Sequence, residues 1–142
     1  MKLPADIHPD LEARLREGQH TGLFQRMGIE IVELSAEYSV GRMPVEGNTQ
    51  TVGLLHGGAH VVLGETLGSL SSAVHGGRSR FPVGLDINAT HSRSIDHGWV
   101  IGTCRAISLG RTICVHEIVN TDEDGNRLST IRMTNYLREV RS

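Results

Sequence analysis

The stretch that decides the fold runs GLLHGGAHVVLGE, from Gly53 to Glu65. It places one acidic side chain among apolar residues, shortly after a glycine pair. Leucine and valine residues continue at helical spacing beyond it, and Gly76-Gly77 supplies a stop signal, which predicts one long helix over about residues 57–75. Glu65 lies near the middle of this helix, and a lone carboxylate among apolar side chains indicates a functional role.

Two other interpretations of this stretch have to be weighed. In the first, Glu65 is simply a side chain on a solvated helix face, which is the commonest place for glutamate. His56 and His60 stand four residues apart, the spacing at which two metal ligands share a helix face. However, a helix turns by about 100° per residue, so Glu65 points away from both histidines, and His56 is expected to precede the helix. No bound metal is therefore expected.

The predicted helix is unusually rich in small residues. Its glycines are Gly57, Gly58, Gly64 and Gly68. Because glycine is a poor helix former, this accumulation indicates that another backbone or a ligand approaches the helix closely. Packing, rather than intrinsic propensity, then has to hold the helix.

The rest of the chain predicts an antiparallel sheet. A short helix begins near Pro9, residues 29–34 and 38–43 form a hairpin, and residues 44–52 form a loop before the long helix. Four further segments alternate between apolar and other residues, as strands do, and Asp124-Gly125 predicts a tight turn between the last two. The alternating positions are Val83, Leu85, Ile87 and Ala89; Trp99, Ile101, Thr103 and Arg105; Ile113, Val115, Glu117 and Val119; and Ile131, Met133, Asn135 and Leu137. Two strands, one apolar helix and four strands predict an α+β fold with the sheet wrapped on the helix.

Composition favours a small soluble enzyme. The chain has 142 residues and a formal net charge of -2, which suits one domain and argues against general nucleic-acid binding. The first residues lack the apolar segment of a signal peptide, and no apolar run is long enough to cross a membrane. A cytoplasmic protein without membrane attachment is therefore expected. The two cysteines, Cys104 and Cys114, fall in predicted strands, where a free cysteine most often acts as a small buried apolar residue.

A family signature is visible in Asn48-Thr49-Gln50, the stretch from Gly53 to Ala59, Glu65 and Ser69. Together these residues resemble the hotdog-fold acyl-coenzyme A (CoA) thioesterases of the phenylacetate-pathway and Arthrobacter-type 4-hydroxybenzoyl-CoA thioesterase group. Related segments follow at residues 83–88, 91–94 and 122–128. The resemblance implies a single hotdog domain, an antiparallel sheet wrapped around one long central helix. Its expected extent is residues 1–142, with an N-terminal helical segment at 1–21 and the hotdog core at 22–138.

The resemblance also implies a reaction, the hydrolysis of an acyl-CoA thioester to a free acid and CoA, with an aromatic acyl group as one option. The backbone N–H of Gly57, at the positive end of the helix, would bind the thioester carbonyl, and Glu65 would attack the carbonyl carbon or activate water. Gln50 matches the position that orients the thioester, and His56 either assists the carbonyl or only holds the turn. Ser69, one turn beyond Glu65, is placed to orient that carboxylate by a hydrogen bond.

The separation of Gly57 and Glu65 along the helix predicts an oligomer. The two residues are eight positions apart. That spacing is about 12 Å along one helix axis, so one carbonyl cannot contact both. The site has to combine Gly57 of one chain with Glu65 of another. A homodimer is therefore the minimum, and the resemblance implies a tetramer built from dimers.

For the CoA moiety, the resemblance implies contacts at two places. Arg111, preceded by Gly110 and followed by Thr112, matches one group of nucleotide and phosphate contacts. Arg93 matches another, with His91 as its neighbour. Solvated surface charges are the alternative for both arginines, and Arg111 stands where family members often carry serine. Because CoA is part of the substrate, no separate cofactor is expected.

Two other function classes stay open. A hotdog hydratase or dehydratase of acyl chains would use a histidine with an Asp or Glu around a different loop, and the glycine pair before a Glu-bearing helix argues against it. A non-catalytic acyl-CoA binding module would hold the same ligand but release no thiol. The sequence does not determine the acyl group.

Overall fold

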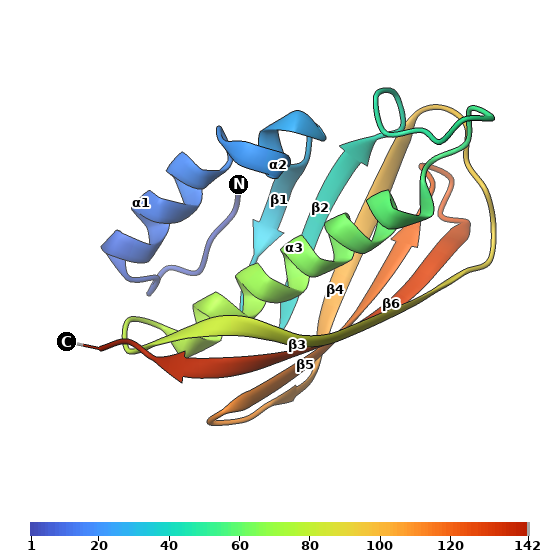
Figure 1. Ribbon diagram of the computed structural model, residues 1–142. Helices are drawn as coiled ribbons and strands as arrows, with labels where there is room; N and C mark the ends of the chain where they lie inside the picture. Colours follow the sequence, from blue (N-terminus) through green and yellow to red (C-terminus); the bar gives the residue numbers. More distant parts are fainter. Residues whose placement is uncertain (142) are drawn as a thin grey trace.

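Six strands form one antiparallel sheet along a long helix in the computed structural model, which describes residues 1–141 (Figure 1). The helices are α1 (Pro9–Gly18), α2 (Gly22–Arg26) and α3 (Gly57–Gly76), and the strands are β1 (Glu30–Leu34), β2 (Tyr38–Pro44), β3 (Arg80–His91), β4 (Trp99–Leu109), β5 (Ile113–Thr121) and β6 (Arg127–Glu139). The strand order is β1-β2-β4-β5-β6-β3, so β3, which follows α3 in the chain, lies at one edge of the sheet. The predicted α+β arrangement of a sheet around one long helix is confirmed.

The central helix α3 has the boundaries that its sequence predicted. Its N-cap is His56, whose Nδ1 accepts a hydrogen bond from the N–H of Gly58 at 2.8 Å. Gly77 ends the helix with a φ of 61°, a conformation that favours glycine. Leu63 and Leu67 on this helix are fully buried against the sheet. The helix is therefore held by burial of one face, with a cap at each end.

Glycines on α3 bring the helix close to β6. A Cβ on Gly64 would lie 2.7 Å from Cδ1 of Ile131, and one on Gly68 would lie 3.0 Å from Sδ of Met133. Both of these β6 side chains are buried. The close approach that the small residues predicted is thus an approach by side chains of the sheet.

Replacing Gly64 with alanine is expected to lower the free energy of unfolding by about 1–2 kcal/mol. Alanine favours a helix over glycine by about 0.5–1 kcal/mol. However, its Cβ would collide with Cδ1 and Cγ2 of Ile131, at 2.7 and 3.1 Å, and this side chain is fully buried. Urea unfolding followed by circular dichroism measures the change. Gly18→Ala is the matched control, since a Cβ there meets no atom within 4 Å; equal stability of both variants would contradict tight packing at Gly64.

Polar side chains are also buried between α3 and the sheet. The hydroxyls of Ser39 and Ser71 are 2.8 Å apart, and Asn135 Nδ2 donates to Ser72 Oγ at 3.2 Å. Both cysteines are free and buried. Burial raises the pKa of the Cys104 thiol to about 11. The thiol therefore stays protonated at neutral pH, and Cys104 behaves as the buried apolar side chain that was predicted.

The predicted strands are present, but the alternating positions named from the sequence are buried only in β6. In β4 and β5 the buried positions are instead Val100, Gly102, Cys104, Cys114, His116, Ile118 and Asn120. In β3 the register shifts between Gly84 and Asp86, so Val83 and Leu85 are exposed while Ile87 packs against the core. The named positions therefore lie on the less buried face of β4 and β5, where β5 buries the polar residues His116 and Asn120, and the bulge turns only the first half of β3 outward.

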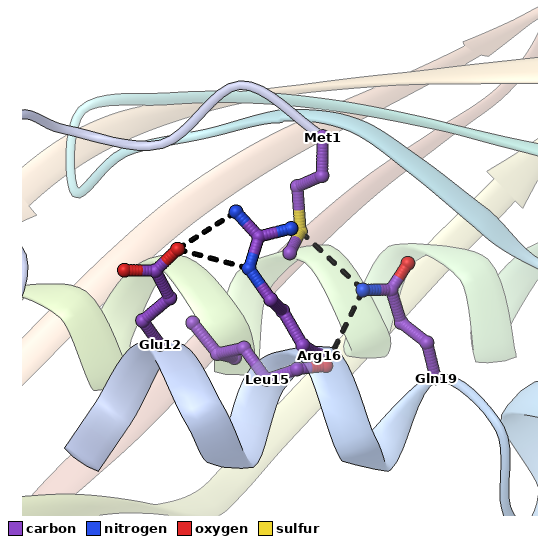
Figure 2. Close-up of polar contacts among 5 residues, drawn as sticks. All are labelled: Met1, Glu12, Leu15, Arg16 and Gln19. Atoms are coloured by element: carbon purple, nitrogen blue, oxygen red, sulfur yellow. Dashed lines mark hydrogen bonds and ion pairs between the residues drawn. The ribbon is translucent and has the colours of Figure 1, made fainter. Parts of the chain in front are cut away.

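The N-terminal segment packs on the same core. Figure 2 shows Gln19, just after α1, donating to Sδ of Met1 at 3.6 Å and to the carbonyl oxygen of Leu15 at 3.3 Å. Leu15 is buried and belongs to the hydrophobic core. Arg16 and Glu12 form a partly exposed ion pair one turn apart, with N···O at 2.7 Å (Figure 2).

No helix within residues 1–141 is long and apolar enough to span a membrane.

Candidate active site

A cavity of about 370 Å³ opens at the start of α3. Its wall includes Gln50, Leu54, Gly57, His60, His91 and Arg93. These residues come from the loop before α3, from the first turn of α3, and from the end of β3 and the segment after it. The cavity thus brings together four residues that the sequence had singled out for a site: Gln50, Gly57, His91 and Arg93.

The loop before α3 is folded back by its own hydrogen bonds, which place Gln50 beside the helix. The Asn48 side chain donates to two backbone carbonyls, those of Met27 and Pro44, each at 2.8 Å. The N–H of His56 donates to the carbonyl of Asn48 at 2.9 Å. The N–H of Gln50 donates to the carbonyl of Leu54 at 2.8 Å, which closes a tight turn. Asn48 therefore ties this loop to the body of the protein, and the N–H of Leu55 adds a hydrogen bond to the carbonyl of Ile95 at 2.8 Å.

The helix start leaves one backbone donor available. The N–H of Gly58 is capped by Nδ1 of His56, and the N–H of Gly57 has no acceptor within residues 1–141. It sits at the positive end of the α3 dipole, where negative charge is stabilised. A Cβ on Gly57 would lie 2.9 Å from Nε2 of His91, so any other residue there would displace the His91 ring. His56 holds the turn through Nδ1, as one of its two expected roles requires.

Two histidines form one side of the cavity. The rings of His60 and His91 stack with centroids 5.2 Å apart and an interplanar angle of 28°. Nδ1 of His91 lies 2.9 Å from Oγ of Ser129, and Nδ1 of His60 lies 3.1 Å from Nδ2 of Asn120. Burial, followed by the charge of His91, lowers the pKa of His60 to about 4. From the sequence, His60 was predicted only as an alternative metal ligand, and its contacts with His91 and Asn120 were missed. The available signal was its position three residues after Gly57, on the same helix face.

Glu65 lies in a different hollow, of about 150 Å³, beside β3. Its Oε1 is 3.6 Å from the position that a Cβ on Gly84 would occupy, and the side chain is exposed. The hydroxyl of Ser69 donates to Sδ of Met133 at 3.8 Å, rather than to Glu65. Within one chain, the structure therefore does not bring Glu65 together with Gly57.

The second predicted group of CoA contacts lies at the other end of α3. His75, near the C-terminal end of this helix, has Nε2 2.8 Å from the carbonyl oxygen of Gly110. The N–H of Leu137 donates to the carbonyl of Thr112 at 2.7 Å, and the guanidinium of Arg80 donates to the carbonyl of Arg111. The helix between the two groups is about 27 Å long. One chain therefore does not bring Gly110, Arg111 and Thr112 near Arg93.

Known proteins are similar to this chain in sequence and in fold. The family model described as Thioesterase superfamily matches residues 52–129. The proofreading thioesterase EntH of Klebsiella pneumoniae is 39% identical over 122 residues, which cover 85% of this chain and 89% of EntH.

Solved structures agree with the sequence comparison. The crystal structure of thioesterase HI1161 from Haemophilus influenzae superimposes with a TM-score of 0.86 at 32% identity, covering 92% of each chain. The crystal structure of a mutant of thioesterase PA1618 from Pseudomonas aeruginosa gives a TM-score of 0.85 at 35% identity, covering 95% of this chain and 98% of that one. These similarities confirm the hotdog fold.

Proposed function

The chain belongs to the thioesterase superfamily and is a thioester hydrolase, and we propose that its substrate is an acyl-CoA. One observation carries the proposal: the unpaired N–H of Gly57, at the positive end of α3, lines a cavity together with Arg93 and His91. A backbone donor suits the carbonyl oxygen of a thioester, and a cationic side chain suits a phosphate of the CoA moiety. CoA enters as part of the substrate, so the reaction needs no separate cofactor.

The hydrolysis follows from these groups. The thioester carbonyl oxygen accepts a hydrogen bond from the N–H of Gly57, which stabilises the negative charge that develops when the carbonyl carbon is attacked. Glu65 either attacks that carbon itself, forming an anhydride that water then cleaves, or removes a proton from the attacking water. The bond between carbon and sulfur breaks, and the sulfur leaves as a thiolate that takes up a proton. Gln50 orients the thioester from the side of the loop.

We propose that the carboxylate comes from a second copy of the chain. Glu65 and Gly57 line separate cavities, and about 12 Å of helix lies between them. The hollow around Glu65 lies at β3, an edge strand that exposes Phe81, Val83 and Leu85. A long apolar edge strand is a template for pairing with another chain.

The register of such pairing is constrained by the two cavities. The register shift leaves one extra residue between Gly84 and Asp86, so an antiparallel pair of β3 strands centred on Asn88 would set Gly84 of one chain opposite His91 of the other. Gly84 lies beside Glu65, and His91 lies beside Gly57. This register would therefore complete a site at each end of the pair, with its carboxylate from one chain and its backbone donor from the other.

A second contact would extend the dimer to the tetramer that the family resemblance implies. Val83, Tyr136 and Ile113 are register neighbours across β3, β6 and β5. All three side chains are exposed. An apolar patch that spans three strands is typical of a surface buried in an assembly.

We assign the acyl group to the aromatic class, in line with the resemblance to 4-hydroxybenzoyl-CoA thioesterases.

Purified protein is expected to release thiol from acyl-CoA substrates, with the highest kcat/KM for benzoyl- or phenylacetyl-CoA in a panel that includes short and long acyl chains. Arg93→Ala should raise KM for acyl-CoA by about tenfold and leave kcat nearly unchanged, because a remote ionic contact contributes uniform binding. Arg111→Ala should act similarly if a second subunit brings it to the CoA moiety. A truncated N-acetylcysteamine thioester should be insensitive to both changes.

Arg14→Ala, on the exposed side of α1, is the matched control for loss of a surface charge. Equal losses on the full and truncated substrates would assign the arginines a structural role. Absence of thiol release from every acyl-CoA, with the truncated thioester still cleaved, would contradict the proposal that the substrate is an acyl-CoA.

A further inference from the structure

His60 is a buried titratable side chain that the proposed hydrolysis does not yet use, and its tautomer is fixed by Asn120. Nδ2 of Asn120 lies 3.1 Å from Nδ1 of His60 and 3.2 Å from the backbone oxygen of the same residue. A carbonyl oxygen only accepts, so the amide atom that faces it has to be the nitrogen. The same amide therefore donates to Nδ1. A neutral imidazole that accepts at Nδ1 carries its proton on Nε2.

The ring of His60 lies beside the helix start. His60 is 3% exposed and lines the cavity that contains Gly57. Helical side chains lean toward the N-terminus, so this ring covers the turn that begins at Gly57. Stacking on His91, whose Nδ1 is held by Ser129, fixes the plane of the ring. Nε2 of His60 makes no hydrogen bond within residues 1–141, and it is not among the fully enclosed polar atoms that lack a partner. The cavity is thus lined by a rigid side chain whose N–H lacks an acceptor.

Burial also decides the protonation state of this ring. The pKa of His60 is lowered to about 4, first by burial and then by the charge of His91. The ring is therefore neutral at pH 7. A neutral imidazole cannot act as a general acid by losing a ring proton at this pH, but it remains a hydrogen-bond donor to a developing oxyanion.

We propose that the Nε2–H of His60 donates a second hydrogen bond to the thioester carbonyl oxygen, beside the N–H of Gly57. The inference rests on the proposed placement of the thioester in this cavity. No proton is transferred in the step: the donor keeps its hydrogen, and the bond strengthens as negative charge develops on the oxygen. His60 would then be a catalytic residue, with Asn120 as the positioning residue that selects its tautomer.

Three variants of His60 separate this role from a structural one. With a truncated benzoyl thioester, His60→Leu is expected to lower kcat by about 10²-fold and to change KM by no more than about twofold. Glutamine carries an N–H close to the position of Nε2, so kcat of His60→Gln should be about tenfold higher than kcat of His60→Leu. Asparagine reaches only the position of Nδ1, so His60→Asn can keep the contact with Asn120 but should not recover kcat. Thermal unfolding and oligomeric state are measured for each variant.

Binding of unreactive analogues gives a readout without turnover. A ketone analogue, with CH₂ in place of the sulfur, keeps the carbonyl oxygen, whereas a thioether analogue lacks it. His60→Leu should weaken binding of the ketone by about tenfold and leave the thioether unchanged. Equal weakening of both analogues, equal recovery by Gln and Asn, or a kcat for His60→Leu within about threefold of wild type would each overturn the inference. Because the kinetic substrate lacks the nucleotide, failure of the CoA proposal alone would leave these results intact.

Discussion

Replacing Glu65 with alanine or glutamine is expected to lower kcat for thioester hydrolysis by about 10²- to 10⁴-fold, the effect of losing a positioned base or nucleophile. Glutamine keeps the shape of the side chain and removes its charge, so a loss with both variants assigns the effect to the carboxylate. KM should change little, because the carboxylate acts on the reacting atoms rather than on the CoA moiety. Steady-state release of thiol measures both constants.

The matched control is Glu17→Gln, since Glu17 is an exposed carboxylate on α1 and lines neither cavity. It should retain nearly full activity. Glu65 is exposed in the single chain and makes no hydrogen bond within residues 1–141, so its replacement should not unfold the protein. Near-normal hydrolysis by Glu65→Ala, in a correctly assembled protein, would reject the assignment of the carboxylate.

Single-turnover hydrolysis in ¹⁸O-labelled water decides between the two roles of Glu65. If the carboxylate attacks the thioester and water then cleaves the anhydride at the carbonyl carbon of Glu65, the bond from that carbon to the bridging oxygen breaks and label enters the enzyme. If the carboxylate only activates water, all label appears in the released acid. Mass spectrometry of the peptide that contains Glu65 distinguishes the two results.

The sequence predicted the central helix well because its limits are local. His56 caps α3 and Gly77 ends it, and both act through neighbouring backbone groups. The glycine face was also predictable, although the partner of Gly64 is Ile131, far along the chain. Local signals of this kind do not depend on how the sheet is ordered.

The buried faces of the strands could not be predicted from apolar alternation. His116 and Asn120 lie on the buried face of β5, where His116 Nε2 reaches the carbonyl of Ala36 at 2.9 Å and Asn120 reaches His60. Buried polar groups need such partners, and these partners come from distant segments. A pattern that counts only apolar residues assigns such a strand to the wrong face.

The candidate site shows the same division between local and long-range information. Gln50 and Gly57 could be singled out because they belong to one loop and one helix start. The stacking of His60 on His91 could not be predicted, because it depends on long-range packing that brings the end of β3 back to the start of α3. The single chain also leaves Glu65 apart from Gly57, as expected for two residues eight positions apart on one helix.

Mixing two inactive variants is expected to restore hydrolysis, and this is the sharpest test of a site shared between chains. Glu65→Ala removes the carboxylate half, and Gln50→Ala impairs the half that contains Gly57. In a mixed dimer, one site then carries both defects and the other carries neither. Random assembly makes about half of the dimers mixed, so about a quarter of all sites should be intact. Thiol release is compared with the residual activity of each variant alone.

Co-assembly of Glu65→Ala with Glu65→Gln is the control, because every site then lacks the carboxylate whether the site is shared or not. Native mass spectrometry measures the fraction of mixed dimers, so recovery can be expressed per mixed dimer. A site contained within one chain would give no recovery with any pair, since each chain would keep its own defect. Mixed dimers without regained hydrolysis would therefore reject the pairing of Glu65 with the cavity of a neighbouring chain, and with it the β3 register that brings Gly84 opposite His91.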